Sequence, residues 1–555
     1  MASETRHWRI LQVGKCASMQ VASVQVCKLQ VYKMDGVWGG VMGRKGVWMA
    51  VFWGLALAVG VLALCQRWQE VVEAAANGVL TVCPGVVCDH TTIQAAVDAA
   101  QDGAVIKVAE GVYTGVQPHN DIDALIYIGG KDRKITIRGG YAVGEWDVSD
   151  PDAHPTILDA EGQRRVLVVN NEEGGGEVIV EGVSIVGGYA SETIAGGWGG
   201  GAYFYNNAKA TLRHSVISGN VAIHGGGVFI HGSKVDVVGC HIVANTAITY
   251  GGGLVLFISD DTQVVSSTIA ANEAQLGGGV YLYRSNRTTM INNFYVDNSG
   301  DDAGAIYVAE CDRPRLIHTT IARNLGDSGV KVVSDSEWEM VNTIIAGHTV
   351  GLDVANDSHA SLEATLWHDN GTDWQGNVSR RSDYDGDPAF VDPDAGDYHI
   401  KEASAAQDRG VAAGVFVDFD GDERPRGGGY DIGADEFPNT LAVSLSATPV
   451  WVRPGDRLTY VIQLSNFETT TLAADITNTL PAQVQPTGVL AWPSQPISPG
   501  KETWEQQIPV TVSAACQGIF VNEVEVATEG GDRFKRALSL GCFSIYLPLV
   551  TRAYQ

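Results

Sequence analysis

Residues 222–253 read AIHGGGVFIHGSKVDVVGCHIVANTAITYGGG, and this stretch decides the fold. Three glycines precede an aliphatic and aromatic run, an I-x-x-N motif follows, and three more glycines close the unit. Triple glycines recur at residues 199–201, 225–227, 251–253 and 277–279, so each step is 26 residues. Asparagines recur in parallel, and a histidine takes the next such place: Asn220, Asn245, Asn272, Asn298, Asn324 and His348. A fixed period of this length is typical of a solenoid.

Each repeat predicts strands whose side chains stack from coil to coil. Counting back three positions from each asparagine or histidine gives one apolar column: Ile217, Ile242, Ile269, Tyr295, Ile321 and Ile345. Counting back five and seven gives two more, which begin with Ser215, Cys240 and Ser267 and with Arg213, Val238 and Val265. Steps of two place the three columns on one strand face, which we expect to point inward. The asparagines are expected to bond to their neighbours above and below, and the glycines to fill corners too tight for a side chain.

A second alternating pattern follows each glycine motif. The first and third positions after it, such as Val228 and Ile230, are apolar and are predicted to face inward. The second and fourth positions are predicted to form an outward aromatic stripe: Tyr203, Tyr205, Phe229, His231, Phe257, Tyr281, Tyr283 and Tyr307. Exposed rings bind sugars or apolar partners, so this stripe is a candidate ligand-binding face. The alternative is that aromatic residues favour strands and support their ladder neighbours.

The composition predicts an all-β chain of four parts. These are a leader (1–76), a parallel β-helix (77–437) with a closing segment (380–437), a β-sandwich (438–545) and a tail (546–555). The leader has Arg44 and Lys45 before an apolar core (47–65), which indicates a signal peptide or a membrane anchor. At the start of the β-helix, TTIQAAVDAAQDG (91–103) predicts a short capping helix with Thr92 as its N-cap. The sandwich is expected from alternating apolar and polar residues between proline and glycine turns.

Charge and cysteine content bound the compartment and the partners. The chain has 555 residues and a formal net charge of -27, which argues against a nucleic-acid partner because phosphate binding needs a basic surface. The sequence contains no C-x2-C pair, so its cysteines do not indicate a zinc site. Cys83 and Cys88 would form a disulfide if the protein is exported. We therefore expect an extracellular or cell-surface monomer, whose N-terminal segment is either removed or held in a membrane.

Carboxylates offer two further kinds of site. A polysaccharide lyase or glycosidase needs clustered acids with a general base, and the chain has Asp260, Asp261, Asp297, Asp301, Asp302, Glu310 and Asp312 near Arg313 and Arg315. Two alternating triplets are candidate Ca²⁺ ligands: Asp383, Asp385 and Asp387, and Asp418, Asp420 and Asp422. The alternative for both sets is that aspartate favours turns. No other cofactor is expected.

These motifs resemble the right-handed parallel β-helix proteins of the pectate-lyase-like superfamily. The glycine and I-x-x-N units resemble polymorphic outer-membrane-protein repeats, and residues 386–436 resemble the closing segment of β-helix surface proteins of the choice-of-anchor Q type. The segment PGDRLTYVIQLSN (454–466) resembles immunoglobulin-like modules of bacterial surface proteins. The resemblance implies the fold, while that fold hosts lyases, hydrolases, adhesins and inert scaffolds.

The function expected from the sequence is therefore non-catalytic. We expect an exported protein that serves in adhesion or binds a polysaccharide or a surface partner along the rod. One alternative is a polysaccharide lyase or glycoside hydrolase that acts on an acidic polysaccharide. A second alternative is a structural spacer.

Overall fold

The computed structural model describes residues 78–542, apart from gaps at 86, 120–121, 130–132, 172–175, 192–194, 207, 438–440, 449–451, 453, 469, 515, 517 and 530–532. The predicted leader and tail lie outside the described residues. In the described part, none of the helices is long and apolar enough to cross a membrane.

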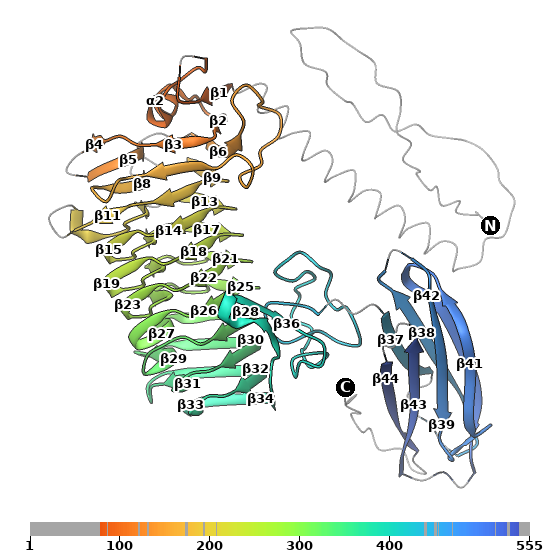
Figure 1. Ribbon diagram of the computed structural model, residues 1–555. Helices are drawn as coiled ribbons and strands as arrows, with labels where there is room; N and C mark the ends of the chain where they lie inside the picture. Colours follow the sequence, from red (N-terminus) through yellow and green to blue (C-terminus); the bar gives the residue numbers. More distant parts are fainter. Residues whose placement is uncertain are drawn as a thin grey trace, which may run out of the picture. The chain divides into compact units, whose positions relative to one another are not determined.

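Two long sheets form the β-helix (Figure 1). The 19 strands of sheet A are β1 (Val79–Val82), β2 (Ala104–Ala109), β3 (Gly111–Tyr113), β6 (Ile135–Tyr141), β7 (Thr156–Asp159), β9 (Glu177–Glu181), β10 (Ser184–Val186), β13 (Lys209–Arg213), β14 (Val216–Ser218), β17 (Lys234–Val238), β18 (His241–Val243), β21 (Gln263–Val265), β22 (Thr268–Ala270), β25 (Thr289–Ile291), β26 (Phe294–Val296), β28 (Asp312–Ala322), β30 (Glu337–Ala346), β32 (His359–His368) and β34 (Val378–Asp385).

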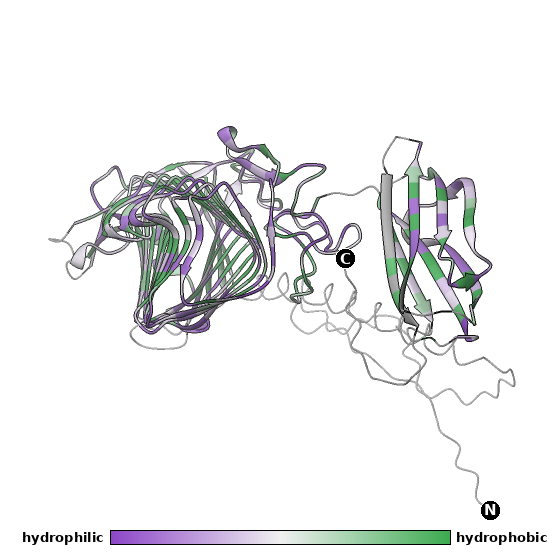
Figure 2. Cartoon of the chain, turned by 90° about the horizontal axis from the view of Figure 1, so that it is seen from below, coloured by the Kyte–Doolittle hydropathy of each residue, from purple (hydrophilic) through white to green (hydrophobic). Residues whose placement is uncertain are grey.

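The 15 strands of sheet B are β4 (Gln117–His119), β5 (Ile122–Gly129), β8 (Arg165–Asn170), β11 (Tyr189–Ala190), β12 (Ala202–Tyr205), β15 (Val221–His224), β16 (Val228–His231), β19 (Thr246–Tyr250), β20 (Leu254–Phe257), β23 (Glu273–Leu276), β24 (Val280–Tyr283), β27 (Ser299–Ala309), β29 (Ser328–Val333), β31 (Val350–Val354) and β33 (Thr372–Gly376). Strands of successive coils pair in parallel, whereas β4 and β5 pair antiparallel. Figure 2 shows the coils lying over one another around a shared interior.

The predicted stacking of equivalent residues is confirmed. Ile217 pairs in register with Ile242, and Ile242 with Ile269, and all three side chains are fully buried in one core. Val228 and Ile230, which follow a glycine triplet, lie in the same core. Equivalent positions of the 26-residue repeat are therefore physical neighbours.

The prediction that the third column, seven positions before each asparagine, faces inward was wrong. Val238 and Val265, which were predicted to face inward, are half-buried, and the adjacent Val237 and Val264 fill the core instead. The residues between the two strands of sheet A in successive coils have left-handed backbone: His214 (φ 46°), Gly239 (φ 60°), Ser266 (φ 45°) and Asn292 (φ 53°). This bend interrupts the extended backbone, so the inward and outward alternation shifts by one residue. Arg213, a charged residue in this column, therefore lies on the outer face, where it forms an ion pair with Glu181.

The asparagine ladder and the glycine corners are confirmed. Nδ2 of each asparagine donates to Oδ1 of the next at 2.9–3.0 Å, from Asn220 through Asn324, and the ladder continues to His348. A Cβ on Gly252 would lie 2.5 Å from backbone atoms of Glu273 and Gly278. The corner therefore admits only glycine because the next coil occupies the space.

The N-terminal end of the β-helix is covered by a helix, as the sequence predicts. Helix α2 (Ile93–Ala99) begins with Thr92, whose Oγ1 accepts from the backbone of Ala95, and its apolar face joins the core. The closing segment contains β35 (Phe390–Asp392), the short helix η2 (Pro393–Ala395) and β36 (Asp397–Ile400). Another short helix, η1 (Ala195–Gly197), lies before β12.

The closing segment packs on the outer face of sheet A. Side chains that include Tyr398, Ile400 and Ile432 share a core with Phe294 and Leu366 of that face. The predicted start of the segment at 380 lies within β34, which still belongs to sheet A. Residues 386–437 therefore form the part that leaves the coils.

Residues 441–542 form two antiparallel sheets around one core. One sheet contains β37 (Leu441–Thr448), β38 (Arg457–Asn466), β42 (Gly500–Val512) and β40 (Val484–Gln485). The other contains β41 (Gly488–Ile497), β39 (Leu472–Leu480), β43 (Gly518–Thr528) and β44 (Arg533–Cys542). This arrangement is a β-sandwich, and the narrower assignment as immunoglobulin-like stays a prediction.

Candidate functional site

The predicted aromatic stripe lies on the outer face of sheet B. We call its eight residues the outer aromatic surface: Tyr203, Tyr205, Phe229, His231, Phe257, Tyr281, Tyr283 and Tyr307. They belong to β12, β16, β20, β24 and β27. The ladder places Phe229 beside Tyr203, and Tyr307 beside Tyr281, in successive coils. Seven of the eight belong to an aromatic cluster separate from the core inside the coils.

The surface has a buried floor, which the sequence did not predict. Tyr203, Phe229 and Tyr281 are only 3–7% exposed. Two rings that the sequence analysis missed cover them: Trp198 stacks on Phe229 with centroids 5.9 Å apart, and Tyr250 stacks on Tyr281 at 4.6 Å. Both covering residues directly precede a glycine triplet, as do His224 and Leu276, and this recurring bulky position is a signal present in the sequence.

The accessible part of the surface is a second column of side chains. Tyr205, His231, Phe257, Tyr283 and the neighbouring Tyr307 are half-buried. His231 pairs in register with Phe257, and Phe257 with Tyr283, and the rings of the latter two stack at 4.9 Å. Burial lowers the pKa of His231, which favours the neutral imidazole. A ligand along this column meets apolar ring area with hydrogen-bonding atoms at its edges.

A polar group that contains Lys331 follows Tyr307 in the ladder that contains Tyr281 and Tyr307. Lys331 pairs in register with Tyr307 and then with Asp353. Its Nζ lies 2.7 Å from Asp302 Oδ1 and 3.1 Å from Asp353 Oδ2. Despite the cost of its burial, these two carboxylates raise the pKa of Lys331. The aromatic column thus ends at a charged group that can exchange hydrogen bonds with a ligand.

The acids considered for catalysis are engaged with cations. Asp260 and Asp261 both form ion pairs with Arg287, and Asp312 pairs with Arg313. Glu310 pairs with Arg284 and also accepts from the Tyr283 hydroxyl at 3.0 Å. Arg315 pairs with Glu339, and Asp301 is exposed beside the Lys331 group. Hydrogen bonds from these arginines lower the pKa of Asp261, Glu310 and Asp312, which favours their ionised forms, whereas a glycosidase also needs a carboxylic acid that donates a proton.

The first predicted Ca²⁺ triplet does not converge. Asp383 forms an ion pair with Arg380. Asp385 is exposed at the end of β34, and Asp387 Oδ1 accepts from the backbone of Ala389 at 2.7 Å. These carboxylates serve local turns and ion pairs, as aspartate at turns often does.

The second triplet is similar, with one exception. Asp418 is 1% exposed and accepts from the backbone N–H groups of Asp420, Asp422 and Glu436 at 2.8–3.0 Å. Asp422 pairs with Arg426 at 2.7 Å. Asp420 turns away from both and lies beside His399, with Oδ2 3.0 Å from Nε2.

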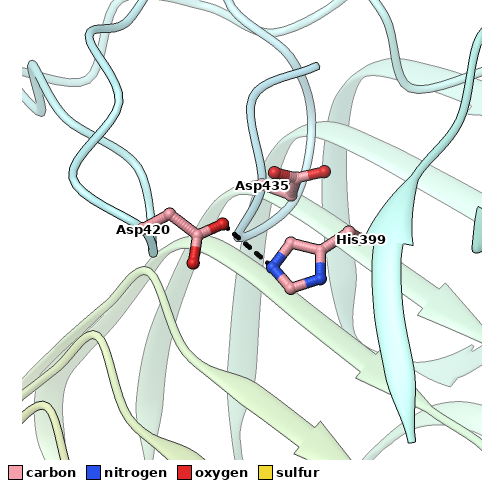
Figure 3. Close-up of side chains that lie close together, drawn as sticks. All are labelled: His399, Asp420 and Asp435. Atoms are coloured by element: carbon pink, nitrogen blue, oxygen red, sulfur yellow. Dashed lines mark ion pairs between the residues drawn. The ribbon is translucent and has the colours of Figure 1, made fainter. Parts of the chain in front are cut away.

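In the described part of the chain, one group of side chains has the geometry of a metal site. His399, Asp420 and Asp435 each offer one ligand atom, and these atoms all lie within 4.8 Å of one another (Figure 3). His399 and Asp435 were not predicted, because nothing in their sequence spacing brings them together.

The predicted pairing of Cys83 with Cys88 is confirmed. Cys83 and Cys88 form a disulfide at the start of the β-helix. Cys240 and Cys311 are buried and lie between strands.

The comparison with protein families agrees with the architecture. Residues 181–365 match the family model described as the right handed beta helix region. The A-module of a mannuronan C-5 epimerase from Azotobacter vinelandii aligns with 14% identity and a TM-score of 0.30, over 57% of this chain and 93% of that one. No curated protein matches the sequence. The coils that carry the outer aromatic surface thus form a right-handed parallel β-helix.

Proposed function

We propose that this chain is an exported protein that binds a polysaccharide, without cleaving it, on the outer aromatic surface of its β-helix. The observation that carries the proposal is the column of half-buried rings on successive coils of sheet B. Coils of a parallel β-helix repeat at about 4.8 Å, so a sugar chain along the axis would meet a new side chain at each coil. Tyrosine rings and sugar rings are complementary because each has an apolar area with polar groups at its rim.

The buried floor makes this surface rigid. Stacked rings such as Phe257 and Tyr283 hold each other in place, so binding would cost little side-chain entropy. The same stacking covers many ring faces, and contact would therefore be made by the outer edges of Tyr205, Phe257 and Tyr283. This geometry suits a modest affinity that is repeated along a long polymer.

Charge narrows the class of polysaccharide. The chain has a net charge of -27, and Lys331 at the end of the surface is already paired with two aspartates. Repulsion would weaken the binding of a strongly acidic polymer. The proposal therefore names a neutral polysaccharide.

Export is supported by two features. Arg44 and Lys45 precede an apolar core (47–65), which is typical of a signal peptide or an anchor. The Cys83–Cys88 disulfide belongs to oxidising compartments outside the cytoplasm.

Affinity electrophoresis through gels that contain neutral polysaccharides tests the proposal. The variants Phe257→Ala and Tyr283→Ala remove accessible rings and leave the floor residues in place. Tyr189→Ala is the matched control, since Tyr189 is a 40% exposed tyrosine on β11 of the same sheet. We expect the wild type and the control to be retarded. The affinity of each ring variant for the polysaccharide should be at least about tenfold weaker than that of the wild type.

Far-UV circular dichroism of each variant checks that the fold is kept. Equal retardation of the wild type and the ring variants would refute the site. A wild type that no polysaccharide retards would refute binding and would favour the spacer.

A further inference from the structure

Three parts of the closing segment meet at one imidazole (Figure 3). His399 lies on β36, Asp420 lies in the turn capped by Asp418, and Asp435 lies near the end of the segment. The ligand set contains one nitrogen and two carboxylate oxygens within 4.8 Å of one another. This site is distinct from the outer aromatic surface and does not depend on it.

The imidazole is oriented as in a metal site. Its Nδ1 lies 2.6 Å from Asp397 Oδ1, which fixes the ring from behind. Its Nε2 faces Asp420 Oδ2 at 3.0 Å and is buried, yet it forms no hydrogen bond to any described residue. A carboxylate on one ring nitrogen and a free second nitrogen aimed at further oxygens is the usual arrangement of a metal-binding histidine.

The surroundings of the imidazole concentrate negative charge. Asp435 is only 6% exposed, and Oδ2 of its carboxylate accepts from the backbone of Ile400 at 2.7 Å. The rings of Phe294 and Phe419 flank the imidazole at 5.5 and 6.1 Å.

The nearby cations do not balance this charge. Arg424 is fully buried in an ion pair with Glu436, and Lys401 donates to the carbonyl of Val391. Asp397, Asp420 and Asp435 all lie close to the imidazole of His399. One imidazole thus faces three carboxylates, and a bound dication would offset the excess.

We propose that His399, Asp420 and Asp435 bind a divalent transition-metal ion, with Zn²⁺ as its representative. Zn²⁺ accepts imidazole nitrogen and carboxylate oxygen at about 2.0–2.2 Å and uses three protein ligands plus water. Ca²⁺ takes six to eight oxygens, which this site does not offer. Tetrahedral ligands at those bond lengths lie about 3.3 Å apart, close to the 3.0 Å between Asp420 Oδ2 and His399 Nε2.

The bound ion would join three segments that lie far apart in the sequence. Because this part of the chain packs on sheet A through Tyr398 and Ile400, the ion would stabilise the conformation in which the closing segment packs on the coils. Metal binding that links segments stabilises the folded state by mass action.

Titration calorimetry of the EDTA-stripped full chain with ZnCl₂, together with elemental analysis, tests the site. We expect one tightly bound Zn²⁺ per chain and a loss of affinity greater than about tenfold in Asp420→Asn and His399→Gln. Asp422→Asn is the matched control, since its carboxylate lies in the same turn but pairs with Arg426. No stoichiometric binding, or equal affinity in Asp420→Asn and the control, would overturn the proposal.

Hydrogen exchange gives a second readout that does not depend on the stability of the variants. In the wild type, Zn²⁺ should slow exchange in residues 397–400 and 418–436 by at least about tenfold, and it should have no such effect in Asp420→Asn. Protection that is unchanged by Zn²⁺ in the wild type would contradict the site even if Zn²⁺ binds elsewhere on the chain.

Discussion

Replacing Asn272 with alanine tests whether the buried amide ladder holds the coils together. Asn272 is fully buried and makes four hydrogen bonds. Its Oδ1 accepts from the backbone N–H and the Nδ2 of Asn245, both at 3.0 Å. Its Nδ2 donates to Ile242 O at 2.8 Å and to Asn298 Oδ1 at 3.0 Å.

The expected cost follows from these contacts. Each buried hydrogen bond contributes about 1 kcal/mol net, so losing four removes about 4 kcal/mol. The smaller alanine side chain also leaves the backbone N–H of Asn245 without its acceptor. Because each coil contacts only its neighbours, the loss should concentrate in β18, β22 and β26.

Hydrogen exchange followed by mass spectrometry measures the effect coil by coil. Asn272→Ala should lower the free energy of opening in these strands by about 4 kcal/mol and leave residues 441–542 unchanged. Asn356→Ala, at an exposed turn, is the control and should change stability by less than about 0.5 kcal/mol. A loss below about 1 kcal/mol in Asn272→Ala would refute the ladder as a source of stability.

Three further predictions concern other buried positions. Burial lowers the pKa of His348 to about 4, so below about pH 6.5 the unfolded chain binds a proton at this residue and the folded chain does not. In denaturant unfolding, the stability of His348→Asn relative to the wild type should therefore rise by about 3 kcal/mol as the pH falls from 6.5 to 4, and a pH-independent difference would contradict this. Arg424→Met leaves Glu436 buried without its cation, and burial already raises the pKa of that carboxyl to about 7. Residues 386–437 of the variant should lose about 3–5 kcal/mol of exchange protection at pH 8 and less at pH 5, where the carboxyl is protonated, and an equal loss at the two pH values would count against the buried pair. Gly252→Ala should cost more than about 3 kcal/mol because its Cβ would meet backbone atoms of the next coil, whereas Gly232→Asn, at φ 54° with open space around it, should cost less than about 1 kcal/mol; similar thermal unfolding of the two variants would contradict the corner geometry.

The periodic part of the fold could be predicted because it depends on repetition. Ile217, Ile242 and Ile269 occupy equivalent places, and a parallel β-helix brings equivalent places into contact. The asparagine ladder and the glycine corners follow from the same rule. The sandwich was predicted from its alternating strands, and its core contains side chains from both sheets.

The third column failed because one local conformation breaks the alternation. The left-handed position between the strands of sheet A holds histidine, glycine, serine or asparagine in different coils. The same left-handed backbone conformation recurs from coil to coil, but the residue type differs, so the sequence does not mark the bend. Counting in steps of two therefore ignored it. The neighbouring core residues, such as Val237 and Val264, were therefore missed.

The candidate sites were predicted unevenly for a related reason. The outer aromatic surface follows the repeat, so its residues could be found, but the rings that cover its floor come from the corners. His399, Asp420 and Asp435 lie in an irregular segment, where no period relates their positions. Only the folding of that segment against sheet A brings them together.

A glycan array run beside a reducing-end assay tests the proposed function most directly. The full chain and the Phe257→Ala/Tyr283→Ala double variant are applied to immobilised neutral and acidic polysaccharides, and each solution is assayed for newly released chain ends. We predict that the wild type is retained on a neutral polysaccharide, that the double variant is not, and that neither releases new ends. Release of ends by the wild type, or full retention of the double variant, would contradict binding without cleavage at this surface.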